Sequence, residues 1–181
     1  MLVLTRTIDR LSDLAAGIAM VMVIALIGIM LFEVFARYVL RAPTFWAFDM
    51  SFMLNGMLFI LAAGYTLKRG AHIRIDFLSQ MMPLRVQHLV NFLFFALLFL
   101  PALGLLTHVA GVQTLTAYQT GRRELSSAWG PLIWPFYAGL ALGCAALWLQ
   151  ALADTARFAI GIRYPDRVPA PGQTAESAPA P

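Results

Sequence analysis

The stretch GYTLKRGAHIRID, residues 64–76, decides how the chain is organised. An apolar run ends at Leu67, Lys68 and Arg69 follow at once, and the carboxylate of Asp76 closes a cluster of fixed charge. Basic residues directly after an apolar run are typical of a membrane helix that leaves the bilayer on the cytoplasmic side. The sidedness of every other segment then follows by alternation along the chain.

The composition is that of a membrane protein. The 181 residues are 60% hydrophobic and 12% charged, whereas soluble domains average roughly 45–50% apolar and about 25% charged residues. The net charge of +4 comes from 13 basic and 9 acidic groups, and the basic ones lie at the ends of apolar runs. Membrane orientation explains this pattern better than nucleic-acid binding does. The one cysteine, Cys144, excludes an internal disulfide and a cysteine metal site.

Four apolar runs are long enough, or nearly so, to cross about 30 Å of hydrocarbon, which takes a helix of roughly 20 residues. The first run, Leu14 to Phe32, is longer than the roughly 7–15 residues of a signal-peptide core, so we interpret it as an uncleaved helix. We predict an all-α integral membrane protein with four transmembrane helices, because lipid offers backbone groups no hydrogen-bond partner. The predicted spans are residues 14–37, 49–68, 86–109 and 129–153.

The remaining segments are short. We predict a cytoplasmic N-terminus over residues 1–13, one membrane domain over residues 14–160, and a disordered cytoplasmic tail over residues 161–181, which is rich in proline and alanine. Residues 73–84, between helices two and three, are too few and too polar to span. We interpret them as an amphipathic segment that lies on the membrane surface.

Two further features concern the predicted helices themselves. Pro101 falls inside helix three and is expected to kink it. Tryptophans favour the two membrane interfaces, so Trp129 and Trp134 are expected at one end of helix four and Trp148 at the other.

The distribution of basic residues predicts that both termini are cytoplasmic. With that orientation nine arginines and lysines fall on the cytoplasmic side and only Arg37, Arg41, Arg122 and Arg123 on the other. Retention of basic residues in the cytoplasm favours this arrangement over its inverse.

Polar residues in the first two helices are candidates for contacts with a partner. Glu33 and Arg37 are four residues apart, so they share a helix face and can pair, and Tyr38 follows at the interface. Such a pair can also be an ordinary interfacial ion pair. Asn55 lies within helix two, where an amide facing lipid is unfavourable, so we expect it inside the bundle or against a partner.

A haem site is the main alternative function, because membrane cytochromes commonly use paired histidines. His88 and His108 are about 30 Å apart if they lie on one helix, which excludes ligation by that pair. His72 and His88 would have to meet inside the membrane. We instead expect interfacial histidines with hydrogen-bond partners and no cofactor.

The sequence carries few groups suited to catalysis or transport. It has no phosphate-binding loop and no nucleophile with a paired base, so we do not expect an enzyme. A carrier requires carboxylates and broken helices near the bilayer centre, and the acidic residues here lie at helix ends. A small transporter that acts alone as a homo-oligomer is therefore a weaker hypothesis than a structural subunit.

With these features the chain resembles the small membrane subunit, the Q-type or DctQ-like protein, of tripartite ATP-independent periplasmic (TRAP) transporters. The resemblance covers about residues 10–160. It rests on Glu33 with Arg37-Tyr38 closing helix one, Trp46 after a proline-containing connection, Gly70-x-His72-Ile73-x-Ile75-Asp76 after helix two, and the segment Trp129–Pro135 before helix four. Family members often carry an acidic pair soon after the tryptophan, where this chain has Asp49 alone.

The resemblance implies a subunit of a sodium-coupled importer of organic acids in a bacterial inner membrane. The partners would be a large multi-helix membrane subunit, which holds the substrate and sodium sites, and a periplasmic binding protein. The small subunit would brace the large one. We expect Glu33, Arg37, Tyr38 and Asn55 at the interface between subunits. Gly70, His72, Arg74 and Asp76 are expected to fix the inner connection, and Trp46, Asp49, Arg122 and Arg123 to contact the binding protein.

Overall fold

The structure, a computed structural model of the chain, describes residues 2–68, 83–125 and 128–164. Its elements are α1 (Leu2–Tyr38), α2 (Ala47–Lys68), α4 (Leu84–Phe94), the π-helical turn η1 (Phe95–Phe99), α5 (Leu100–Thr120) and α6 (Trp134–Arg163). α4, η1 and α5 follow one another without a break, so these residues contain four helices long and apolar enough to cross a membrane. The predicted four-helix membrane fold is confirmed.

The helices extend beyond the predicted spans. α1 begins at Leu2, within the predicted N-terminal segment, and its 37 residues correspond to about 55 Å. The third span continues to Thr120, where we expected it to end near Val109. Threonine hydroxyls explain the difference, because Thr107 and Thr114 donate to the carbonyls of Leu103 and Ala110 in their own helix. Their polarity therefore does not end the helix, which stops at Gly121 with φ of 59°.

The fourth helix is displaced toward the C-terminus. It begins at Trp134, with Pro135 in its first turn, a position where the missing N–H of proline costs nothing. It continues past Ala153 to Arg163, because Asp154 and Arg157 pair on one helix face at 2.9 Å. The predicted surface segment over residues 73–84 lies almost wholly outside the described residues, and so does the tail from residue 165 onward.

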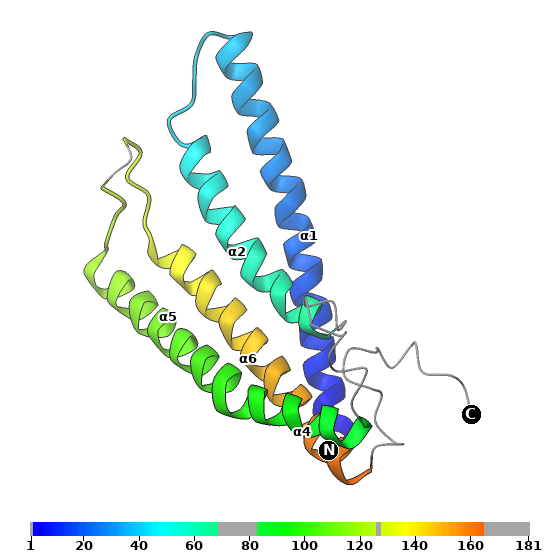
Figure 1. Cartoon of the computed structure of the whole chain (residues 1–181). Coiled ribbons are helices and arrows are strands. Elements are labelled where there is room, and N and C mark those ends of the chain that lie inside the picture. The colour runs from blue at the N-terminus through cyan, green and yellow to red at the C-terminus, as the bar shows by residue number, and fades with distance from the viewer. Residues whose placement is uncertain (1, 69–82, 126–127, 165–181) are drawn as a thin grey trace.

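The four spans form a layer rather than a compact bundle (Figure 1). α1 packs on α2, α2 on α6, and α6 on α5, which gives the spatial order α1, α2, α6, α5. α6 is the central helix and carries more buried residues than any other described helix. The start of α1 and the end of α6 lie at one end of the layer, and the helices diverge toward the other end, which carries the connections 39–46 and 121–133.

Pro101 has the local effect that the sequence predicts. It follows the π-helical turn η1, and the third span bends where α4 meets α5 (Figure 1). Proline has no N–H to donate to the carbonyl four residues back, so the ladder of hydrogen bonds is interrupted there. A wider turn just before the proline is a common way for a helix to absorb that loss.

Glycines allow α2 and α6 to approach closely. A Cβ on Gly143 would lie 3.2 Å from the backbone of Ile60 and Leu61, and one on Gly56 would lie 2.9 Å from the ring of Phe136. The core of the molecule lies beside this contact, where Leu67, Phe95, Leu103, Leu147, Ala151 and Phe158 are all buried.

Candidate functional site

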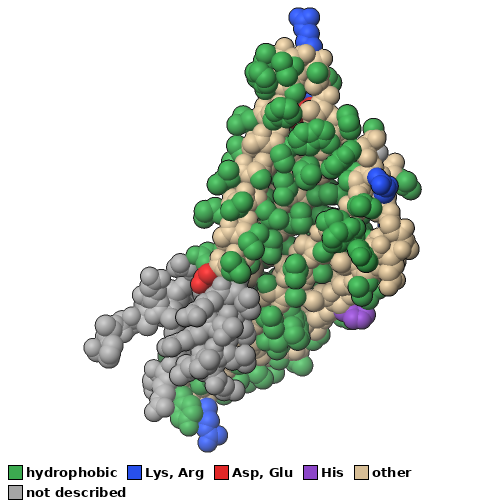
Figure 2. Space-filling view, turned by 180° about the vertical axis from the view of Figure 1, so that it is seen from behind, with side chains coloured by type: hydrophobic (Ala, Val, Ile, Leu, Met, Phe, Trp, Pro, Cys, Tyr) green, Lys and Arg blue, Asp and Glu red, His purple; other side chains and the backbone are tan. Residues whose placement is uncertain are grey.

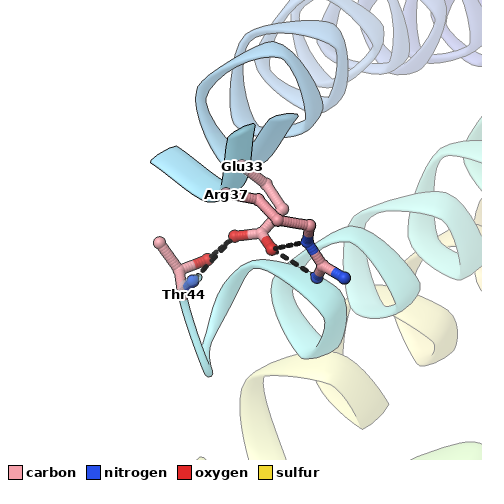
Figure 3. A network of polar contacts seen from close by, with 3 residues as sticks. All are labelled: Glu33, Arg37 and Thr44. Carbon is pink, nitrogen blue, oxygen red and sulfur yellow. Dashed lines mark hydrogen bonds and ion pairs between the residues drawn. The ribbon is translucent and has the colours of Figure 1, made fainter. Parts of the chain in front are cut away.

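The connection between α1 and α2 is held by one carboxylate (Figure 3). Oε1 of Glu33 accepts hydrogen bonds from Nε and Nη2 of Arg37, at 3.0 and 2.5 Å. Oε2 accepts a hydrogen bond from the backbone N–H of Thr44 at 2.9 Å and another from its hydroxyl. The expected pairing of Glu33 with Arg37 is thus present. Both oxygens of Glu33 are occupied within the chain, whereas Arg37 and Tyr38 remain exposed.

The residues proposed for binding-protein contact all lie at the end of the layer that carries the two connections. The ring of Trp46 stacks on Phe32, with centroids 6.1 Å apart, just before Asp49 in the first turn of α2. Arg122 and Arg123 are exposed on the connection between α5 and α6. This connection is ordered by its backbone, because the N–H of Ile133 donates to the carbonyl of Arg122 and the N–H of Glu124 to that of Pro131.

A groove of about 380 Å³ lies between the first half of α2 and the segment that leads into α6. Three methionines of α2 form one wall, Met50, Met53 and Met57, and the segment before α6 forms the other. Arg123 lies at its rim, where the guanidinium donates to the carbonyl of Gly130 at 3.1 Å. The groove shows that the helices diverge at this end and that flexible, apolar side chains line the gap.

The residues of the inner-connection motif, Gly70, His72, Arg74 and Asp76, fall outside the described residues. A polar contact that we did not predict joins α1 to α6. The hydroxyl of Ser12 donates to Oε1 of Gln150 at 2.9 Å, and both side chains are buried. Ser12 and Gln150 are 138 residues apart in the sequence, so no local pattern could reveal the pair.

The environment of His88 differs from the expected interfacial one. The imidazole is fully buried, and neither ring nitrogen has a hydrogen-bond partner in the part of the chain that the structure describes. The ring packs on Phe158, with centroids 6.3 Å apart, and against the backbone of Gly161. The hydrogen-bond partners that we expected for this histidine are not found among the described residues. Nothing in its surroundings favours the haem alternative, because protein atoms enclose the ring.

Trp148 also lies in an unexpected place. We expected it at an interface, but it occupies the middle of α6, and its indole N–H donates to the carbonyl of Leu100 at 3.1 Å. The indole fits there because Gly104 has no side chain, and a Cβ at that position would lie 3.3 Å from Nε1. This tryptophan therefore joins α6 to α5 beside the proline bend.

Asn55 is exposed on α2 rather than inside the layer. Its neighbours on the same helix face are Phe48, Phe52 and Phe59, which are 65–75% exposed. We predicted that this amide would lie either inside the bundle or against a partner, and the first of these arrangements is not found. The second remains a prediction.

The described residues form a membrane protein whose charged groups lie mostly near helix ends and whose faces are largely apolar. Figure 2 shows hydrophobic side chains over most of one face, with few charged ones in view. No group of three or more histidine, cysteine, aspartate or glutamate side chains that could hold a metal ion occurs among the described residues. These features define a small, multi-span membrane protein whose outer surface is suited to lipid or to another membrane protein.

Comparison with known proteins identifies the family. The model of the DctQ component of tripartite ATP-independent periplasmic transporters matches residues 26–160, which is most of the chain. The chain therefore belongs to the DctQ family, the small component of TRAP transporters. This is a family of transporter subunits and not a class of enzyme. No curated protein matches the chain.

Proposed function

We propose that this chain is the small permease subunit of a sodium-coupled TRAP importer of organic acids in a bacterial inner membrane. Family membership supports the subunit role. In this role the chain binds no substrate and braces a large, elevator-type membrane subunit that holds the substrate and sodium sites. Both termini lie in the cytoplasm, which agrees with the excess of basic residues on that side.

The observation that carries the bracing role is the layered arrangement of the spans. A single layer in the order α1, α2, α6, α5 leaves two broad apolar faces open, whereas a compact bundle would bury its inner faces. Such a layer would add a wide, static surface to the large subunit, whose elevator-type transport step requires one part to move against a fixed part. The close α2–α6 contact at Gly143 and the bond from Trp148 to Leu100 stiffen it.

The same arrangement supports contact with the periplasmic binding protein. Trp46 lies just before α2, Asp49 lies in its first turn, and Arg122 and Arg123 lie on the connection after α5, yet all four lie at one end of the layer. In the proposed orientation this end faces the periplasm. An exposed arginine pair beside an apolar groove offers both charge and contact area to a soluble partner.

Transport in reconstituted vesicles tests this function. The large subunit, the binding protein and this chain are incorporated together, and uptake of labelled mono- and dicarboxylates is followed with and without an inward sodium gradient. We expect uptake only when this chain and the gradient are both present. Equal uptake without the chain would contradict the bracing role, and uptake by this chain alone would support the homo-oligomeric transporter instead.

A further inference from the structure

Asn55 carries a polar group well inside α2, one of the helices long and apolar enough to cross a membrane. It lies eight residues after Ala47 and 13 before Lys68, which places it about 12 Å and about 20 Å from the two ends of α2. The side chain is exposed, and no atom in the described part of the chain accepts or donates a hydrogen bond to its amide. Lipid tails cannot supply this bond, so the amide needs a partner from elsewhere.

Two other polar side chains in the spans meet this need within their own helix. The amide of Asn91 donates to the carbonyl of Gln87 at 2.8 Å, and the hydroxyl of Thr66 to that of Ala62 at 3.0 Å. Asn55 does not bond back in this way. One turn earlier, the hydroxyl of Ser51 is buried and also has no partner among the described residues. Two unsatisfied groups thus lie four residues apart on one side of α2.

Aromatic rings surround this polar position. Phe48, Phe52 and Phe59 lie seven, three and four residues from Asn55, so all four side chains share one face of the helix. We call this face, consisting of Phe48, Phe52, Asn55 and Phe59, the α2 ridge. The ridge is open because the other sides of α2 pack on α1 and α6.

We propose that the α2 ridge is the surface on which a transmembrane helix of the large TRAP subunit docks. The helix that fits would present a hydrogen-bonding group to Asn55 at mid-membrane, and small residues that admit the three phenylalanine rings. This inference rests on the proposed function. A lipid would satisfy the rings but not the amide, because lipid headgroups lie at the surface. The amide therefore specifies a protein partner at this depth.

Photocrosslinking locates the contact. Benzoylphenylalanine is placed in turn at Phe52, at Phe59 and, as a control, at Phe94, a half-exposed phenylalanine on α4. The three full-length chains are co-expressed with the large subunit and irradiated. We expect crosslinks to the large subunit from Phe52 and Phe59 and none from Phe94. Crosslinks to a second copy of this chain, to lipid alone, or with equal yield at all three positions would overturn the proposal.

Substitution of the amide tests its chemistry. In lipid nanodiscs we expect Asn55→Leu to weaken binding to the large subunit about three- to tenfold, the range typical of one interhelical hydrogen bond in a membrane. Asn91→Leu is the matched control and should leave binding unchanged. The isolated Asn55→Leu chain should unfold at the same temperature as the unaltered chain or above it, whereas a structural role for Asn55 would lower that temperature.

The outcomes separate this inference from the function on which it rests. If the unaltered chains form no complex, the proposed function fails and the ridge fails with it. If they form a complex that Asn55→Leu does not weaken and that gives no crosslink at Phe59, the ridge alone is wrong, and the large subunit docks on another face of the layer.

Discussion

Two buried polar side chains at opposite ends of the layer, Glu33 and His88, differ in their hydrogen bonding. Both oxygens of Glu33 are hydrogen-bonded, and they tie Thr44 and Arg37 into the α1–α2 connection. His88 is fully enclosed between α4 and α6 with both nitrogens unpaired in the described chain. A buried polar group without a partner is unfavourable. The imidazole therefore contributes to packing through its ring rather than through a hydrogen bond.

The contact between His88 and Gly161 gives a prediction at the residue scale. A Cβ on Gly161 would lie 2.6 Å from Nδ1 of His88, and the enclosed ring has little room to move. We expect Gly161→Ala to lower the free energy of unfolding in detergent by about 1–3 kcal/mol, the usual cost of overpacking. Equilibrium unfolding followed by circular dichroism measures it.

Two comparisons make this prediction specific. Gly111→Ala should be neutral or slightly stabilising, because nothing lies within 4 Å of a Cβ there and alanine favours a helix. In a His88→Ala background, Gly161→Ala should lose most of its effect. An unchanged effect in that background would show that the clash involves something other than the imidazole.

At the scale of elements, the sequence predicts the number of helices better than their ends. The four apolar runs are visible in the composition, and the Glu33–Arg37 pair follows from helical spacing. The helices continue past the predicted spans, because polar residues such as Thr114 and Asp154 stay helical and bond within their own helix. Long-range contacts such as that of Ser12 with Gln150 produce no local sequence pattern, so they could not be predicted.

The α2–α6 contact gives a prediction that compares two glycines of α6. A Cβ on Gly143 would meet the side chain of Ile60 and its backbone, which can yield only if the helices separate. A Cβ on Gly139 would meet only the flexible side chain of Met57. We expect Gly143→Ala to destabilise the protein by about 1–3 kcal/mol and Gly139→Ala by clearly less. Thermal or denaturant unfolding of both variants measures the two losses of stability. A larger loss for Gly139→Ala than for Gly143→Ala would contradict the described contact.

At the scale of the whole molecule, the layer separates its polar ends from its apolar faces. Sequence composition indicates a membrane protein, but it does not distinguish a layer from a bundle, because both need four apolar helices. Whether the helices form a layer or a bundle depends on which helix faces pack together. Here the glycines of α6 pack on α2, and the indole of Trp148 packs on α5. The layer is the feature that links fold to the proposed role.

Exposed charge at the end of the layer predicts salt-dependent docking. Replacing Arg122 and Arg123 together by glutamine should weaken binding of the periplasmic protein to the membrane complex, and more at low than at high salt, because salt screens exposed charges. Surface plasmon resonance over a range of sodium chloride concentrations measures this. Gln substitution of Arg41, on the other connection, provides a comparison. If the double substitution leaves the salt dependence of binding unchanged, these two arginines are not part of the docking surface.

The central claim is that this chain is one part of a larger membrane assembly. The most direct test is to co-express the tagged chain with the large TRAP subunit, purify it in mild detergent, and determine the mass of the product. The account predicts a stable one-to-one complex that persists through size-exclusion chromatography. Recovery of this chain alone, monodisperse and folded, with the large subunit absent, would contradict it.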